Sequence, residues 1–361
     1  MSPDLAAHHM ARALRLAERG RTSTHPNPRV GCVIVRAGEV VGEGAHLRAG
    51  EPHAEVHALR QAGDRARGAD LFVTLEPCSH HGRTPPCAEA VIAAGIARVW
   101  IAMQDPFPAV AGRGIDALRA AGIAVEIGLM QAEAQRLNRG FVSRLTRGRP
   151  HVTLKLGASL DGRTAMASGE SQWITSVEAR ADVHRLRADA GAVMTGVATV
   201  MADDPQLNAR DVAGELRQPD RIVIDSQARV PAKARIWAPG ARRLWLVGRD
   251  PVQVPDGVEV LRVPMSADDS VDLGGALAAL AQQQVNEVLL ECGPRLAGAF
   301  LQQQLVDEVV AYVAPTLLGH EARPFAYLPG LDRLSQRLHL QWLDVRQIGP
   351  DLKLTARPAS P

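Results

Sequence analysis

Cysteine is scarce in this chain, with four among 361 residues, too few for a scaffold held by disulfides. Aromatic residues make up 3% and the formal net charge is only +2, whereas proteins that track nucleic acid strands need a basic groove with stacking aromatics. No apolar run approaches the roughly 18 residues of a membrane span, and residues 1–20 lack the apolar centre of a signal peptide. We therefore expect a cytoplasmic protein whose partner is neither a membrane nor a nucleic acid.

The length fits two cores of ordinary size, and 46% of the residues are apolar. A polar segment at 146–150 ends in Pro150 and suggests a boundary, so we predict two domains, 1–147 and 151–361. In the first, we expect helices at 10–19, 52–61, 88–94 and 115–121, and strands at 30–35, 40–41, 71–75, 99–102 and 125–127. In the second, we expect a helix at 178–188 and strands at 152–156, 192–195, 221–224, 244–247, 287–292 and 308–314. This alternation predicts an α/β fold in both domains, with a largely parallel sheet in the first.

Three residues of the first domain predict a zinc site: His53, Cys78 and Cys87. Nucleobase deaminases hold zinc with one His and two Cys, and a Glu two residues after the His, here Glu55, is the general acid/base. Zinc with three protein ligands keeps a position for water and lowers the pKa of that water. Glu55 could then take the proton and return it to a departing amine. Pro52 predicts that His53 and Glu55 lie in the first turn of a helix.

Two alternatives for these residues stay open. Each could be an ordinary buried side chain, although the complete set in order favours zinc. The zinc could also be purely structural, with a fourth protein ligand drawn from Cys32, His57, His80 or His81.

Two glycine-containing segments could bind phosphate. Residues 112–117 match the dinucleotide pattern G-x-G-x-x-A, but they follow a loop rather than a strand, so we interpret them as a tight turn into a helix. Residues 291–299 follow an apolar strand and open a helix. Free backbone amides there could hold a phosphate at the positive end of the helix, or the segment could be a plain strand–helix turn.

Several long segments together resemble one family, the bifunctional deaminase–reductases of riboflavin biosynthesis. They include the loop from Cys78 to Cys87, which is longer than the C-x-x-C of other deaminases, and Thr24-His-Pro-Asn-Pro28. The resemblance covers roughly residues 10–354 and continues through 104–106, 110–114, 155–163, 169–175 and 202–205. It implies a cytidine-deaminase-like N-terminal domain and a dihydrofolate-reductase-like C-terminal domain.

The resemblance also implies which residues bind the cofactors and the substrate. The NADPH site would comprise Gly157, Trp173, Thr199, Asp203, Ser226 and the loop residues Gly293, Pro294, Arg295, Leu296, Ala297, Gly298 and Ala299. The phosphorylated substrate would meet Ser171, Arg187, Leu207, Arg210 and Glu291. Arg187 and Arg210 could hold its phosphate, and Lys155 and Asp161 could contact its sugar chain. In the deaminase domain Asn27, His46 and Asp105 are further candidates for substrate contacts.

The resemblance therefore implies a zinc- and NADPH-dependent enzyme with two successive activities. It would deaminate a diaminopyrimidinone that carries a ribosylamino 5′-phosphate, and then reduce the ribosyl group to a ribityl chain. One rival is a nucleoside or RNA-base deaminase with a non-catalytic reductase-like domain. Another is a non-catalytic protein with a structural zinc, such as a nucleotide sensor. A homo-oligomer is compatible with the sequence.

Overall fold

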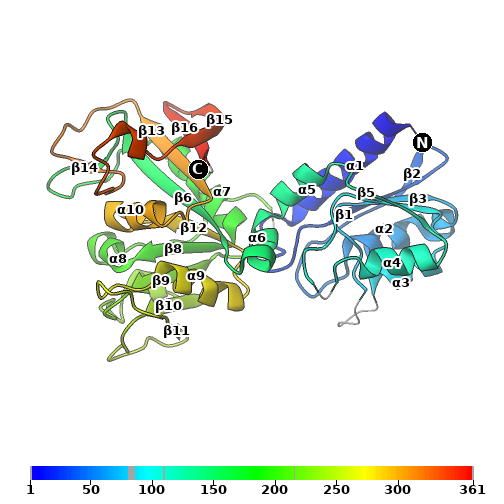
Figure 1. Ribbon diagram of the computed structural model, residues 1–361, viewed down its shortest axis with the longest axis horizontal. Helices are drawn as coiled ribbons and strands as arrows, with labels where there is room; N and C mark the ends of the chain where they lie inside the picture. The colour runs from blue at the N-terminus through cyan, green and yellow to red at the C-terminus, as the bar shows by residue number, and fades with distance from the viewer. Residues whose placement is uncertain (1, 80–85, 109, 215, 360–361) are drawn as a thin grey trace. The chain divides into compact units, whose positions relative to one another are not determined.

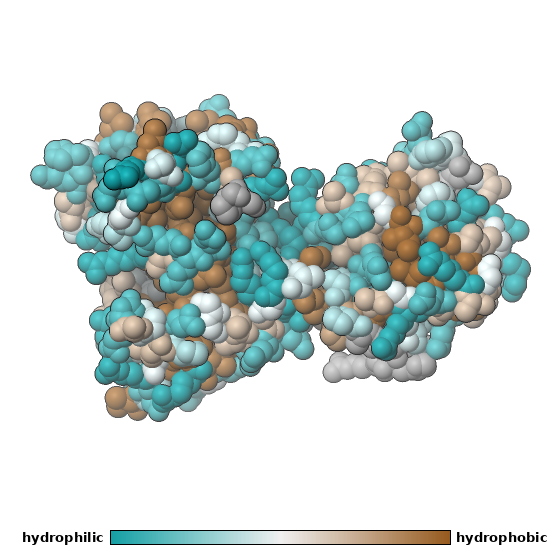
Figure 2. Space-filling model, viewed as in Figure 1, coloured by the Kyte–Doolittle hydropathy of each residue, from teal (hydrophilic) through white to brown (hydrophobic). Residues whose placement is uncertain are grey.

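The computed structural model describes residues 2–359 except 80–85, 109 and 215 (Figure 1). The chain divides into two compact units, Met1–Gly148 and Arg149–Pro361. No helix within the described ranges combines the length and apolar character needed to cross a bilayer. Hydrophilic residues cover most of the visible face of each unit, with hydrophobic residues in separate patches (Figure 2).

The first unit is a five-stranded sheet with helices on both faces. Its helices are α1 (Pro3–Ala17), α2 (Ala54–Ala62), α3 (Cys87–Ala93), α4 (Arg113–Ala120), α5 (Gln131–Leu137) and α6 (Arg139–Arg147). Its strands are β1 (Gly31–Arg36), β2 (Glu39–Ala45), β3 (Asp70–Val73), β4 (Arg98–Ile101) and β5 (Ala124–Ile127). The first helix begins earlier than expected because Pro3 can occupy its first turn and the Ser2 side chain caps it.

The sheet of the first unit has the order β2-β1-β3-β4-β5. β1 pairs antiparallel with both β2 and β3, whereas β3–β4 and β4–β5 are parallel. The expectation of a largely parallel sheet is therefore wrong for half of the pairings. The cause is the connection through α2, which places β3 beside β1 rather than beside β2.

Two helices pack closely against this sheet from opposite faces, α1 on one side and α2 on the other (Figure 1). Glycines in the strands allow the close approach. A Cβ atom at Gly31 would lie 1.9 Å from the Ala13 carbonyl oxygen of α1, and one at Gly44 would lie 2.0 Å from the Ala54 carbonyl oxygen of α2. The N-terminal end of α2 is thereby fixed against β2.

The second unit is built on a nine-stranded sheet of order β11-β10-β9-β8-β12-β6-β13-β16-β15. Its strands are β6 (His151–Ser159), β8 (Ala192–Gly196), β9 (Asp220–Asp225), β10 (Arg243–Val247), β11 (Glu259–Arg262), β12 (Glu287–Glu291), β13 (Glu308–Ala314), β15 (Leu340–Ile348) and β16 (Asp351–Pro358). β7 (Arg163–Ala165) and β14 (Arg323–Pro324) form a separate pair. Its helices are α7 (Val177–Ala190), α8 (Val197–Asp203), α9 (Leu273–Gln282) and α10 (Pro294–Gln302).

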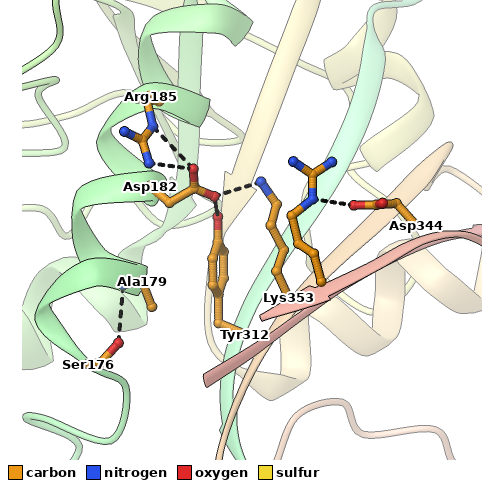
Figure 3. A network of polar contacts seen from close by, with 8 residues as sticks. Ser176, Ala179, Asp182, Arg185, Tyr312, Asp344 and Lys353 are labelled. Carbon is orange, nitrogen blue, oxygen red and sulfur yellow. Dashed lines mark hydrogen bonds and ion pairs between the residues drawn. The ribbon is translucent and has the colours of Figure 1, made fainter. Parts of the chain in front are cut away.

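The strands from β11 to β13 are parallel. In the final hairpin, β16 pairs antiparallel with β13, and β15 pairs antiparallel with β16. The sequence interpretation did not include this hairpin. Its strand β16 holds α7 through a buried polar network (Figure 3). The Asp182 carboxylate of α7 accepts a hydrogen bond from Tyr312 Oη at 2.5 Å and lies 2.6 Å from Lys353 Nζ.

Candidate active sites

His53 stands at the N-terminal end of α2. Its backbone is extended, with φ −74° and ψ 167°, so His53 is the cap residue and Ala54 is the first helical residue. The expected helix start at Pro52 is therefore two residues too early. Glu55 lies in the first turn, where the helix dipole favours a negative charge.

The two cysteines reach His53 from a loop and from the start of the next helix. Cys87 is the first residue of α3, and its backbone N–H donates to Cys78 Sγ at 3.3 Å. His53 Nδ1 lies 3.2 Å from Cys87 Sγ and 3.6 Å from Cys78 Sγ. The three ligand atoms all lie within 4.8 Å of one another, so one ion can contact them all. Imidazole and thiolate are the donors that zinc prefers.

Among the described residues, no fourth His, Cys, Asp or Glu belongs to this group. Cys32 is fully buried on β1, and His57 lies one turn further along α2; neither is part of it. The remaining two candidates, His80 and His81, lie outside the described residues. Three protein ligands are the number found where zinc keeps an open position.

The electrostatics of the cysteine pair also fit a cation. The pKa of Cys78 is lowered to about 4, because the Cys87 thiol donates to its sulfur and His53 lies beside it. The pKa of Cys87 is raised, because its thiol donates to Cys78 and is buried. Two adjacent thiolates repel each other, so a positive ion between them favours the ionised form of both.

Glu55 has the environment of a proton carrier. Its side chain is 3% exposed, and its Oε2 has no hydrogen-bond partner among the described residues. Burial raises the pKa of Glu55 to about 7, although the nearby His53 opposes this shift. A carboxyl group with this pKa can both accept and donate a proton near neutral pH.

Two of the expected substrate contacts of the first unit lie beside this group. The His46 ring packs edge-on against the His53 ring, with centroids 5.2 Å apart. Asn27 Nδ2 lies 3.1 Å from His46 Nε2, and the Pro52 carbonyl oxygen lies 3.3 Å from His46 Nδ1. Neutral His46 satisfies both contacts when its proton is on Nδ1. Asp105 Oδ1 accepts a hydrogen bond from the Phe107 backbone N–H at 2.8 Å.

A buried carboxylate occupies the glycine-containing turn at 112–117. Glu76 Oε2 accepts from the backbone N–H groups of Asp105 and Gly112, each at 3.1 Å. Its Oε1 accepts from those of Gly114 at 2.9 Å and Ile115 at 3.3 Å. Gly112 has φ +81° and caps α4, so the interpretation as a tight turn into a helix is confirmed. These amides already have an anionic partner within the chain.

The second unit contains an open cleft of about 1770 Å³. It brings together most of the residues that the resemblance implied for NADPH and substrate. Of the residues implied for NADPH, those that line the cleft are Gly157, Trp173, Thr199, Asp203, Ser226, Gly293, Pro294, Arg295, Leu296 and Ala299. All the residues implied for the substrate line it as well: Ser171, Arg187, Leu207, Arg210 and Glu291. Gly293 caps the N-terminal end of α10, as expected for the segment 291–299.

Three of the expected residues do not line the cleft. The Ala297 backbone N–H donates within α10 to the Gly293 carbonyl, so it is not free for a phosphate. A Cβ atom at Gly298 would lie 1.8 Å from the Tyr327 carbonyl oxygen, so this glycine serves helix packing. The Asp161 carboxylate accepts hydrogen bonds from Ser159 Oγ and from the backbone N–H groups of Leu318 and Gly319, which makes it a loop cap.

Arg187 is committed to an ion pair inside the cleft. Its Nε lies 2.5 Å from Glu291 Oε1, its Nη2 lies 3.0 Å from Oε2, and Lys155 Nζ lies 3.7 Å from the same carboxylate. Burial raises the pKa of Glu291, but the cations Arg187 and Lys155 outweigh it and the pKa is about 2. In this structure Nε and Nη2 of Arg187 hold Glu291, and its Nη1 donates to the Asn208 carbonyl at 3.0 Å.

Arg180 and His184 are among the cleft residues that the sequence interpretation missed. Both lie on α7 with Arg187, at spacings of four and three residues, which places the three side chains on one face of the helix. A basic stripe at this spacing was a signal that could have identified them. Arg180 stacks on the indole of Trp173, with its guanidinium carbon 4.5 Å from the ring centroid.

The comparisons with known proteins agree with this geometry. The family model described as the cytidine and deoxycytidylate deaminase zinc-binding region matches residues 4–103, and that of the RibD C-terminal domain matches residues 150–354. The riboflavin biosynthesis protein RibD of Escherichia coli strain K12 is 55% identical, over 96% of this chain and 98% of that protein.

Two solved structures extend the similarity to the whole fold. RibD of Acinetobacter baumannii has a TM-score of 0.93 at 45% identity, covering 99% of this chain and 100% of that one. A Thermotoga maritima diaminohydroxyphosphoribosylaminopyrimidine deaminase/5-amino-6-(5-phosphoribosylamino)uracil reductase has a TM-score of 0.89 at 33% identity, with 99% of both chains covered.

A zinc-binding deaminase unit followed by a second α/β unit with a wide cleft defines a two-domain enzyme of the deaminase–reductase class. Its first unit has the expected cytidine-deaminase-like fold, and its second has the reductase fold of that class. The chain belongs to the RibD family of riboflavin biosynthesis proteins. It is a bifunctional deaminase and reductase, and the alternative of a deaminase with a non-catalytic second domain is not favoured.

Proposed function

We propose that residues 1–147 form the deaminase and residues 151–361 the reductase of this enzyme. The first would deaminate 2,5-diamino-6-ribosylamino-4(3H)-pyrimidinone 5′-phosphate. The second would reduce the ribosyl group of the product and give 5-amino-6-ribitylamino-uracil 5′-phosphate. The observation that carries the proposal is the convergence of one imidazole and two thiols beside the buried carboxylate of Glu55, whose Oε2 has no hydrogen-bond partner among the described residues.

In the deaminase, His53, Cys78 and Cys87 would hold the zinc ion. When bound, zinc lowers the pKa of a water molecule and so makes it a nucleophile near neutral pH. Glu55 accepts a proton as water attacks the ring carbon and delivers it to the departing amine. Its pKa of about 7 suits both transfers. His46 and Asn27 lie beside this group and would orient the pyrimidine ring.

In the reductase, NADPH supplies a hydride when bound, and residues of the cleft would hold the NADPH. The backbone N–H groups of Arg295 and Leu296 lie in the first turn of α10, where such groups have no partner within the helix. Gly293 faces open space, so a pyrophosphate can approach the backbone there. Trp173, Thr199, Asp203 and Ser226 would line the remainder of the NADPH site, together with Gly157, Pro294 and Ala299.

The substrate would bind in the same cleft. Ser171 and Leu207 would contact it, and Glu291 would accept hydrogen bonds from its sugar hydroxyls while Arg187 and Lys155 hold the carboxylate in place. Arg210 would meet its phosphate. A small phosphorylated pyrimidine is thus the proposed partner; cytoplasmic location and a homo-oligomer stay predictions.

The test is to incubate the full chain with the diaminopyrimidinone phosphate, zinc and NADPH, and to follow products by mass spectrometry. Glu55→Gln should abolish ammonia release, retain zinc by metal analysis, and still reduce the deaminated intermediate. Glu51→Gln, which changes an exposed carboxylate, is the control and should keep both activities. Loss of both activities in Glu55→Gln, or ammonia release from it, would contradict the proposal.

A further inference from the structure

Asn27 lies in the loop that precedes β1, and few backbone hydrogen bonds can hold it there. Its own N–H donates to the Thr24 carbonyl at 2.8 Å. Pro26 and Pro28 stand on either side of Asn27, and a proline has no backbone N–H to donate. The next backbone donor after Asn27 is therefore Arg29. The position of Asn27 relative to β1 thus depends on what binds the backbone of Arg29.

The side chain of Asn138 binds both backbone groups of Arg29. Its Oδ1 accepts from the Arg29 N–H at 2.8 Å, and its Nδ2 donates to the Arg29 carbonyl at 2.9 Å. Asn138 is 3% exposed and lies where α5 ends and α6 begins. Because β1 begins only at Gly31, this carboxamide takes the place that a neighbouring strand would have beside Arg29.

The side chain of Arg29 adds a second connection at the same place. Its Nη1 donates to the Leu137 carbonyl at 2.9 Å, next to Asn138. Its Nη2 donates to the Arg21 carbonyl at 3.2 Å and lies 3.4 Å from His25 Nε2. The buried guanidinium therefore joins the end of α5 to the beginning of the loop. Arg29 closes the loop, and Asn138 holds Arg29.

Asn27 connects this junction to the metal group. Its Nδ2 lies 3.1 Å from His46 Nε2, and the His46 ring packs against the ring of His53. Pro28 has a fixed φ, and it restricts Asn27 before it to extended conformations. A shift of the Arg29 backbone is therefore transmitted to Asn27, because the residues between them have little freedom to absorb it.

We propose that Asn138 is a positioning residue of the deaminase, which sets the orientation of Asn27 by binding the backbone of Arg29. This inference rests on the proposed function, in which Asn27 orients the pyrimidine ring. Both polar atoms of the Asn138 side chain contact Arg29, so its effect on deamination passes through Asn27.

A double-mutant cycle distinguishes this role from simple support of the fold. Asn138→Ala removes both contacts with Arg29, and Asn27→Ala removes the side chain through which Asn138 acts. In the full-length, zinc-loaded enzyme, Asn138→Ala should lower kcat/KM for ammonia release roughly tenfold to a hundredfold, as expected for a misplacement of about 1 Å. In the Asn27→Ala background, the same substitution should change kcat/KM by less than about twofold.

Two controls accompany the cycle. Gln135→Ala removes an exposed carboxamide from the same helix, α5, and should leave deamination unchanged. Zinc content by metal analysis and kcat/KM for reduction of the deaminated intermediate are measured in every variant. Both should stay at their wild-type values in Asn138→Ala, because neither depends on Asn27.

Several results would overturn the inference. An equal loss in both backgrounds, or loss of zinc from Asn138→Ala, would assign Asn138 to support of the fold. Unchanged ammonia release in Asn138→Ala would remove it from the reaction. Full activity of Asn27→Ala would remove the residue through which it acts. If the wild-type enzyme released no ammonia from the diaminopyrimidinone phosphate, the proposed function would fail instead.

A second measurement does not depend on turnover. The ring nitrogens of His46 can be observed by nuclear magnetic resonance in the zinc-loaded full chain with labelled histidine, and the signals absent from His46→Gln identify them. Because Asn27 donates to Nε2, the Nε2 signal should move in Asn138→Ala in the same direction as in Asn27→Ala, and should not move in Gln135→Ala. An Nε2 signal that Asn138→Ala leaves in place would contradict the inference, even where Asn27→Ala is too slow for kinetics.

Discussion

The buried carboxylate of Glu76 offers a sharp test of how the deaminase unit is held together. It is 3% exposed and accepts four backbone N–H groups, from Asp105, Gly112, Gly114 and Ile115. Glu76→Ala would leave these four amides without their acceptor. At about 1 kcal/mol for each, the low end for buried unsatisfied groups, the first unit should lose about 4 kcal/mol of unfolding free energy.

Hydrogen exchange of the full chain, read by mass spectrometry on peptides that cover residues 104–120, measures this loss locally. If exchange follows opening of the unit, a loss of about 4 kcal/mol accelerates it roughly 1,000-fold. Glu76→Gln keeps one acceptor oxygen and should lose about half as much free energy. Glu133→Gln changes an exposed carboxylate and should stay within about 0.5 kcal/mol of the wild type. A loss below about 1 kcal/mol in Glu76→Ala would refute the reasoning.

Three further predictions concern charge and metal. Because the folded-state pKa of Glu291 is lowered to about 2, its ionised form stabilises the fold at pH values above the ordinary pKa of a glutamate, and this stabilisation is lost as the pH falls toward 2. The midpoint temperature of thermal unfolding should therefore fall over this pH range more in the wild type than in Glu291→Gln. Lys353→Met removes a partly buried partner of Asp182 and should lower the free energy of unfolding in urea by about 3 kcal/mol, whereas the double variant with Asp182→Asn should regain most of it. Zinc removal by a chelator should stop ammonia release while NADPH oxidation with deaminated intermediate continues; equal loss of both would contradict two independent sites.

Local chemistry made the metal group predictable from the sequence. His53, Cys78 and Cys87 are separated by 25 and 9 positions, yet their residue types and order indicated one ion before any distance was known. The turn at Gly112 was also predictable, because it follows a loop. Its partner Glu76 was not, because only the folded chain brings a residue 36 positions away under the turn.

The elements missed by the sequence interpretation have physical causes. In β15, the pairing register shifts between Trp342 and Asp344, so the alternation of apolar and polar residues is interrupted. The direction of β3 relative to β1 depends on the path of the connection through α2. The pattern of apolar residues in the sequence does not reveal that path. The residue type of Arg187 indicated that it binds an anion. That this anion is the Glu291 carboxylate depends on a contact between α7 and the end of β12, which the sequence does not show.

The last strand has a consequence for shortened forms of the protein. Asp351 Oδ2 accepts the Ser176 backbone N–H at 2.7 Å, just before α7 begins, and Lys353 neutralises Asp182 further along that helix. A polypeptide terminated after Gly349 would still contain every residue proposed to touch zinc, NADPH or pyrimidine. It would keep the contact between Tyr312 and Asp182 but lose the other two contacts of the helix that carries Arg187. We therefore expect it to be a weaker reductase although it contains all of these residues.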